Sequence, residues 1–257
     1  MVDDGDIAPI LRARLAGEPL VRVAGLRDLD DGYRLQERAN AELARHFGPV
    51  VGIKIGGTTA AMRHYIGAPE PVFGCVFRAH LQRGRGRAEL SRYRRLGLES
   101  EIAVRLGRPL PLHAGPHRPE EMEGVVAGMM AAVELVEDRY RDFRQTGAPT
   151  IVADNAFNAG LVLGPERPPV PSAQLGRLLV RSWVNGRLVA EGRADALLGH
   201  PLQALAWLAD RLAALGWRIP EGQLVSLGTV TPVQWVERPG RFAVWVEALG
   251  RAALRLV

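Results

Sequence analysis

Apolar residues recur at helical spacing in the first part of the chain. Residues 4–17 and 29–46 place apolar side chains three and four positions apart, which predicts two amphipathic helices. Asp28 directly precedes the second segment, and two more aspartates follow in its first turn. Carboxylates at this position interact favourably with the positive end of a helix dipole. We therefore predict an N-terminal helical segment over residues 1–48.

From residue 49 onward, the pattern changes to short β-branched and apolar runs. The runs at 50–55, 72–77 and 96–106 predict buried strands. The Asn185-Gly186 pair lies between two further strand-like runs and predicts a tight hairpin turn. Additional strands are expected at 133–136, 224–227, 242–248 and 252–256.

Three segments in this second region have helical patterns. They cover residues 58–65, 120–132 and 201–215, and the last begins with proline and is followed by Gly216. Strands of mixed length combined with helices outside a regular βαβ order favour an α+β fold. We expect a rolled, mainly antiparallel β core with flanking helices, forming a catalytic domain over residues 49–257.

The charge of the chain raises the question of a nucleic-acid partner. The formal charge of the 257 residues is +5 at pH 7, and the densest basic cluster comprises Arg83, Arg85, Arg87, Arg92, Arg94 and Arg95. Few aromatic residues are interleaved with it and it matches no nucleic-acid motif, so we interpret it as a solvated, mobile loop and expect no nucleic-acid partner.

No apolar run approaches the roughly 20 residues of a membrane helix. A lone cysteine, Cys75, fits a reducing compartment, so we expect a cytoplasmic protein without a membrane partner.

The distribution of basic residues singles out one position. Lys54 is the only lysine in the chain, and the other 32 of the 33 basic residues are arginine. Only lysine readily loses its proton when it is partly buried. Because Lys54 lies between two isoleucines in a predicted strand, we favour a proton-transfer role over the chance survival of a surface lysine.

Carboxylates in the predicted strands indicate a metal site. Glu99 and Glu101 are two residues apart, so both side chains leave the same face of their strand. Glu134 lies inside another apolar run. Neighbouring buried carboxylates repel one another unless a cation compensates them, and an all-oxygen site selects a hard ion such as Mg²⁺ or Mn²⁺. The alternative is an edge strand with one solvated face.

Several segments together resemble the hydratase and decarboxylase group of the fumarylacetoacetate hydrolase superfamily. The matching segments, in order, are GIKIG at 52–56, EP at 70–71, FG at 73–74, LESEIA at 98–103, ELV at 134–136, ADNA at 153–156, LGHPLQALAWL at 198–208, and the tail from Ser226. The resemblance covers roughly residues 50 to 257 and implies a rolled β core. It also implies a divalent metal held by Glu99, Glu101 and Glu134, with Lys54 at the substrate.

The chain departs from this pattern at one position. Val72 occupies the place where many members of the group carry an aspartate that assists proton transfer. Either Glu70 substitutes as a catalytic residue, or water does, or the reaction differs. The resemblance favours Thr229 as a ligand of the substrate carboxylate, although turn stabilisation would explain it too. Asp154 and Asn155 are candidates for substrate binding, for orienting a metal-bound water or for structural capping.

The function implied by this resemblance is a metal-dependent lyase. We expect addition of water to a 2-hydroxy-2,4-dienoate, giving a 4-hydroxy-2-oxo acid, in a homo-oligomer that acts on a small 2-oxo acid. Decarboxylation of a 2-oxo acid by the same group is the alternative, and hydrolysis of an acylpyruvate ranks third. A catalytically idle assembly subunit, suggested by Val72 and the arginine cluster, is the alternative from another class.

Overall fold

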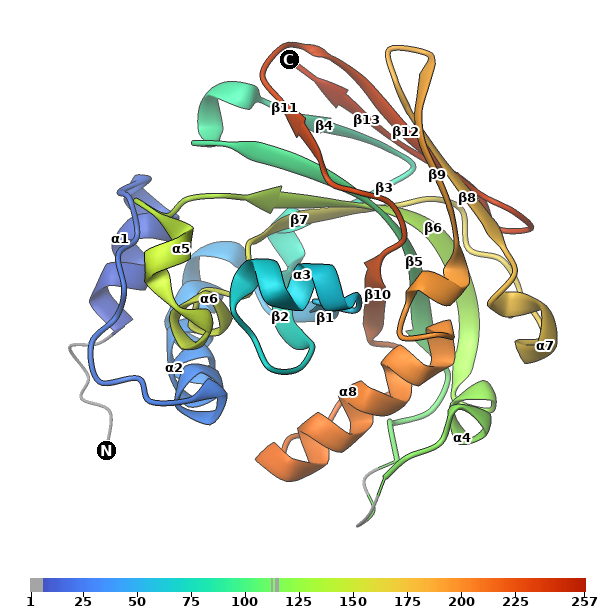
Figure 1. Ribbon diagram of the computed structural model, residues 1–257, viewed down its shortest axis with the longest axis horizontal. Helices are drawn as coiled ribbons and strands as arrows, with labels where there is room; N and C mark the ends of the chain where they lie inside the picture. The colour runs from blue at the N-terminus through green and yellow to red at the C-terminus, as the bar shows by residue number, and fades with distance from the viewer. Residues whose placement is uncertain (1–6, 112, 114–115) are drawn as a thin grey trace.

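The computed structural model describes residues 7–111, 113 and 116–257, in which two β-sheets are flanked by helices (Figure 1). The larger sheet has the strand order β2-β1-β10-β5-β6-β7-β3, with β11 paired to β5. Its strands are β1 (Val50–Gly56), β2 (Val72–Phe77), β3 (Leu81–Arg83), β5 (Leu96–Leu106), β6 (Val126–Glu137), β7 (Asn158–Leu163), β10 (Leu224–Thr229) and β11 (Gln234–Val236).

The smaller sheet has the order β4-β13-β12-β8-β9 and packs over the β5, β6 and β7 part of the larger sheet. Its strands are β4 (Arg85–Ala88), β8 (Leu179–Val184), β9 (Arg187–Arg193), β12 (Gly240–Val246) and β13 (Gly250–Leu256). Neighbouring strands run antiparallel except for the pairs β1–β10, β3–β7 and β4–β13. The expected α+β fold with a curled, mainly antiparallel core is confirmed.

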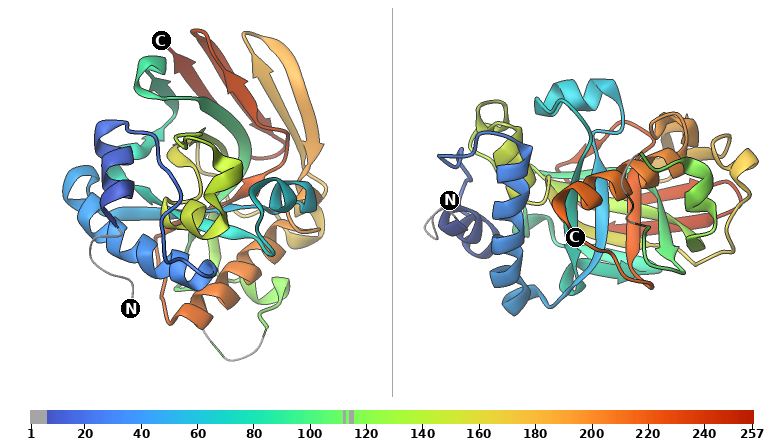
Figure 2. Two further views of the ribbon diagram at one scale, coloured as in Figure 1. Left: turned by 60° about the vertical axis from the view of Figure 1, so that its left-hand side comes forward. Right: turned by 90° about the horizontal axis from the view of Figure 1, so that it is seen from below.

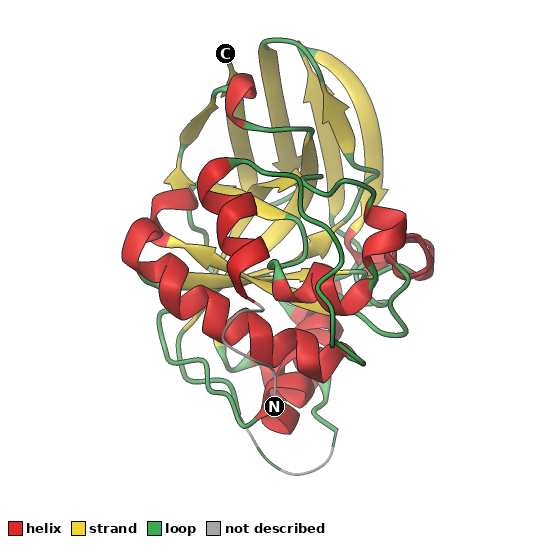
Figure 3. Cartoon of the chain, turned by 90° about the vertical axis from the view of Figure 1, so that its left-hand side faces the viewer, coloured by secondary structure: helices red, strands yellow, loops and turns green. Residues whose placement is uncertain are grey.

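Most of the helices lie away from the smaller sheet, as Figure 3 shows, whereas α7 lies beside β8 (Figure 1). They are α1 (Ala8–Ala16), α2 (Leu29–Phe47), α3 (Ala60–Ile66), α4 (Pro119–Glu123), α5 (Phe143–Thr146), α6 (Ala148–Ala153), α7 (Ser172–Leu175) and α8 (Pro201–Leu215), with short 3₁₀ turns at Arg78–His80, Leu90–Arg92 and Ala194–Ala196. The views of Figures 1 and 2 agree that α1, α2, α5 and α6 form one group at the side of the larger sheet. Helix α2 packs on α6, which places the N-terminal helices against the segment that leads into β7.

Capping residues explain where the two longest helices begin and end. The Asp28 side chain accepts a hydrogen bond from the backbone N–H of Asp31 at the start of α2, as N-cap residues do. His200 caps α8 through Nδ1, and α8 ends at Gly216 with a φ of 70°. Asn185 and Gly186 also have positive φ values, 50° and 83°, in the turn between β8 and β9, so the predicted hairpin is confirmed.

The helix predicted over residues 120–132 is wrong. The structure has a five-residue helix, α4, followed by the long strand β6. β6 is paired with β5 on one side and β7 on the other, and nearly all its residues are buried. A strand buried on both faces has a continuous apolar sequence that periodicity does not distinguish from a buried helix.

The arginine cluster is not simply a loop. It contains β3 and β4, and β4 pairs with β13 at the edge of the smaller sheet. Arg85 and Arg87 are exposed while the intervening Gly86 is buried, which is the two-residue alternation of a strand with one solvated face.

Candidate metal centre

Three glutamates converge on the larger sheet. β5 and β6 are antiparallel neighbours, and their register places Glu99 opposite Glu134. Glu101 lies two residues farther along β5, so its side chain leaves the same face as that of Glu99. Carboxylate oxygens of the three residues lie within 4.8 Å of one another. The structure therefore brings the predicted glutamates together as one set of hard oxygen donors.

Glu101 and Glu134 are fully buried, and each has only one of its two carboxylate oxygens hydrogen-bonded by residues that the structure describes. Glu101 Oε2 accepts a hydrogen bond from Ser226 Oγ. Glu134 Oε1 accepts one from Asn158 Nδ2 at 3.0 Å and lies 3.3 Å from Lys54 Nζ. Within the described part of the chain, Glu101 Oε1 and Glu134 Oε2 have no hydrogen-bond partner. Buried acceptors that lack donors are costly, and a cation bound between them would satisfy both.

Burial disfavours the charged forms of these carboxylates. Burial, followed by the charge of Glu134, raises the pKa of Glu99 to about 8. Burial and the charges of Glu134 and Glu99 raise the pKa of Glu101 well above its usual range. Lys54 opposes the shift at Glu99, but one ammonium group does not balance three carboxylates. A divalent cation is the group that this donor set fits.

Lys54 reaches the glutamates from the neighbouring part of the sheet. β1 lies between β10 and β2, where Lys54 is opposite Ser226 and Gly74. The Lys54 side chain is 4% exposed, and its Nζ donates a hydrogen bond to the carbonyl oxygen of Ala156. The single lysine of the chain is thus held between this carbonyl group and Glu134.

A small pocket opens beside Lys54 and Glu99, with a cavity volume of about 60 Å³. This volume admits a few water molecules or part of a small organic acid. Its described lining residues carry no charge apart from these two. One face of α3 contributes to an apolar wall whose side chains include Met62, Tyr65, Ile66, Val136, Phe157 and Trp235. The pocket therefore combines a charged end with an apolar remainder.

Three predicted site residues differ in their relation to this pocket. Thr229 and Val72 line it, and the Thr229 hydroxyl donates to the carbonyl oxygen of Thr231 at 2.8 Å. Glu70 is not among the lining residues. Its side chain is 39% exposed and lies 3.7 Å from Arg211 Nε, so the structure does not place Glu70 where the missing acid would act.

Asp154 and Asn155 also lie outside the pocket lining, in a buried polar network. Asp154 forms ion pairs with Arg14 and Arg139. Asn155 accepts a hydrogen bond from the backbone N–H of Cys75 at 2.8 Å and exchanges side-chain hydrogen bonds with Asn40. The geometry favours the structural alternative for both residues over direct substrate binding, because their polar atoms are occupied by the protein.

Sequence patterns did not identify Ser226 and Asn158, whose side chains donate hydrogen bonds to the buried glutamates. Ser226 is a small polar residue between apolar neighbours in the predicted strand at 224–227, and this interruption was the available signal. Asn158 begins β7, a strand that was not predicted. Its role depends on a neighbouring strand, which local sequence does not reveal.

Comparison with known proteins identifies the family of the chain. The model of the fumarylacetoacetate (FAA) hydrolase C-terminal family matches residues 70–257. A 2-keto-4-pentenoate hydratase of Burkholderia vietnamiensis is 34% identical over 259 residues, covering 97% of each chain. A 4-oxalocrotonate decarboxylase of Pseudomonas putida is 29% identical over 227 residues, covering 88% of this chain and 85% of the relative.

Solved structures agree with the sequence comparisons. The 4-oxalocrotonate decarboxylase from Pseudomonas putida G7, complexed with magnesium and adipate, superposes with a TM-score of 0.91 at 25% identity, covering 100% of this chain and 99% of that one. Among the residues that the structure describes, no helix is long and apolar enough to cross a membrane. Both the matching family model and the relative at 34% identity show that this chain belongs to the fumarylacetoacetate hydrolase family.

Proposed function

We propose that this protein is a divalent-metal-dependent hydratase that adds water to a 2-hydroxy-2,4-dienoate and gives a 4-hydroxy-2-oxo acid. The observation that carries the proposal is the pocket, which joins Glu99 and Lys54 to an uncharged and mostly apolar lining. Relatives named 2-keto-4-pentenoate hydratase cover nearly the whole chain, which supports the same activity.

Glu99, Glu101 and Glu134 would hold the metal, which we propose to be Mg²⁺ or Mn²⁺. Hard cations of this kind prefer carboxylate oxygens, and one oxygen each of Glu101 and Glu134 accepts no hydrogen bond from the described part of the chain. When bound, the ion supplies Lewis acidity that stabilises negative charge on the 2-oxygen of the substrate.

Lys54 is the proposed proton carrier. Its Nζ lies beside Glu134 and lines the pocket, so it can hold and move the proton that is transferred when the dienol becomes a ketone. Thr229 is proposed to contact the substrate carboxylate. Its hydroxyl donates to the carbonyl oxygen of Thr231 in this structure. A carboxylate only accepts hydrogen bonds, so the hydroxyl would turn its proton from Thr231 towards the substrate to make this contact.

The apolar lining favours hydration over decarboxylation of a dicarboxylic 2-oxo acid. A second carboxylate would need a cation in the apolar part of the pocket, yet Lys54 is the only basic residue in the described lining. Arg95 lies over the Trp235 ring, but it does not line the pocket and pairs with Asp138 at 3.6 Å. Decarboxylase relatives and the apolar Val72 keep decarboxylation as the second candidate.

The direct test is an assay of the purified protein with Mg²⁺ on a 2-hydroxy-2,4-dienoate and on a dicarboxylic 2-oxo acid. We expect loss of dienoate absorbance and a product heavier by one water, with a kcat/KM at least about tenfold above that for the diacid. The rate is expected to be modest because Val72 removes one proton carrier. Loss of CO₂ from the diacid without hydration of the dienoate would favour the decarboxylase. No reaction with any divalent metal would favour an idle subunit.

Metal binding is expected to change how stability depends on pH. The pKa of Glu99 is about 8 in the folded, metal-free protein, against a usual value of 4.5. The folded state therefore binds more protons than the unfolded state between these values, and the free energy of unfolding falls as the pH rises through them. We expect the melting temperature of the EDTA-treated protein to fall from about pH 5 to about pH 8. Saturating Mg²⁺ is expected to flatten this slope and to release protons on binding; a slope that Mg²⁺ leaves unchanged would contradict the assignment.

A further inference from the structure

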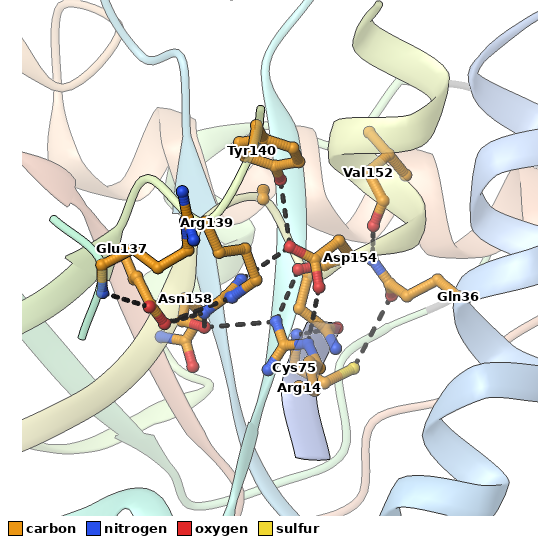
Figure 4. Close-up of polar contacts among 12 residues, drawn as sticks. Arg14, Gln36, Cys75, Glu137, Arg139, Tyr140, Val152, Asp154 and Asn158 are labelled. Atoms are coloured by element: carbon orange, nitrogen blue, oxygen red, sulfur yellow. Dashed lines mark hydrogen bonds and ion pairs between the residues drawn. The ribbon is translucent and has the colours of Figure 1, made fainter. Parts of the chain in front are cut away.

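Figure 4 shows a buried ion cluster in which Arg14 and Arg139 pair with Asp154. Asp154 is fully buried and accepts hydrogen bonds from Arg14 Nε at 2.7 Å, Arg139 Nη1 at 2.6 Å and the Tyr140 hydroxyl at 3.1 Å. Although burial opposes its ionisation, the two guanidinium groups hold the pKa of Asp154 below its usual range. The cluster is therefore charged, and Glu137, which pairs with Arg139 at 3.1 Å, balances the second guanidinium group.

Both arginines extend past Asp154 to one backbone carbonyl. Arg14 Nη2 lies 3.2 Å and Arg139 Nη2 lies 3.1 Å from the carbonyl oxygen of Asn158. Arg14 Nη2 also donates to the carbonyl oxygen of Asp154 at 2.5 Å. The guanidinium groups thus fix the backbone at both ends of the turn over residues 154–158.

The turn between these two fixed points has an unfavourable conformation. Asn155, Ala156 and Phe157 have φ values of 58°, 47° and 66°, a region that residues other than glycine rarely occupy in succession. Such a backbone persists only where its surroundings hold it. Gly74 permits a close approach, because a Cβ atom there would lie 2.2 Å from the carbonyl oxygen of Asn155.

This turn presents two groups to the proposed active site. The carbonyl oxygen of Ala156 accepts the hydrogen bond of Lys54 Nζ. Asn158 Nδ2 donates to Glu134 Oε1 at 3.0 Å. We propose that Asn158 is a positioning residue that orients Glu134 for metal binding, and that Arg14 and Arg139 hold it in place through Asp154 and the Asn158 carbonyl. The proposal rests on the metal site of the proposed function and extends it to the N-terminal helix α1.

A purely structural role does not account for Asn158. Its side chain is fully buried, and its Oδ1 has no hydrogen-bond partner among the described residues. A half-satisfied buried amide is less favourable for stability than an apolar side chain of similar size. The donor that faces Glu134 is therefore the feature that asparagine supplies and leucine does not.

The test compares Asn158→Leu with Gln36→Leu. Gln36 is also a fully buried amide, but its Nε2 donates to the carbonyl oxygens of Phe73 and Val152 rather than to a glutamate. We expect Asn158→Leu to weaken Mn²⁺ binding, measured by calorimetry or electron paramagnetic resonance, by about 10- to 100-fold. Gln36→Leu is expected to lower the melting temperature of the metal-free protein and to leave the Mn²⁺ affinity unchanged.

Mn²⁺ binding by two further variants tests the same inference. If Asn158→Leu does not fold, the smaller Asn158→Ser also removes the amide that donates to Glu134. Arg14→Lys keeps the positive charge beside Asp154 but loses the hydrogen bond to the carbonyl oxygen of Asn158. Both are expected to weaken Mn²⁺ binding. Folded Asn158 variants with the Mn²⁺ affinity of the natural protein would overturn the inference. Absence of Mn²⁺ binding by the natural protein would instead overturn the proposed metal site.

Discussion

Glu101→Gln is expected to lower the affinity for Mg²⁺ or Mn²⁺ by more than about 100-fold, beyond the loss expected for a residue that only orients a ligand. The substitution preserves volume but removes one of three negative charges and a hard ligand. The fold should remain intact, because glutamine still accepts the hydrogen bond that Glu101 receives from Ser226. Calorimetric titration with each ion measures the effect.

The metal-free protein provides a second readout for the same variant. Because the pKa of Glu101 lies well above its usual range, ionising this residue opposes folding near neutral pH. Glu101→Gln should therefore melt at a higher temperature than the natural chain in EDTA at about pH 8. Glu191→Gln, on β9 and paired with Arg181, serves as the control and should alter neither property. Unchanged metal affinity in a folded Glu101→Gln protein would remove Glu101 from the metal site.

Lys54→Arg is expected to reduce turnover by at least about 100-fold, the usual scale for loss of a general acid or base. Arginine retains the positive charge beside Glu134 but does not give up its proton at a working pH. The measurement is kcat with a dienoate at saturating Mg²⁺, with circular dichroism to confirm folding and a metal titration to confirm binding.

A neutral variant separates the charge of Lys54 from its proton. Lys54→Met keeps a long apolar stem and removes the contact with Glu134. Both variants should lose turnover to a similar extent, whereas a purely electrostatic contact would spare Lys54→Arg. Near-normal turnover by the arginine variant would assign proton transfer to another group.

The sequence was most informative where local patterns have one structural meaning. β-branched runs bounded by glycine predicted β1, and an Asn-Gly pair predicted the turn between β8 and β9. The run at residues 126–132 was ambiguous because β6 is buried between β5 and β7, and these neighbours, not local preference, decide its conformation.

Local patterns also predicted some of the site residues, whereas others depend on how the strands pair. The two-residue spacing of Glu99 and Glu101 fixes their common face, and the register of β5 with β6 adds Glu134. The lone lysine likewise indicated Lys54. The contact of Asn158 with Glu134 depends on the pairing of β6 with β7. No pattern within either segment determines that pairing.

The contact between Arg14 and Asp154 also bears on how the chain folds. The two residues are 140 positions apart, so closing this contact orders a long stretch of chain and carries a large loop-closure entropy. Contacts of such separation slow folding. During synthesis, α1 leaves the ribosome long before its acidic partner exists. The proposed support of Glu134 can therefore form only after residue 158 has been made and the two segments have met.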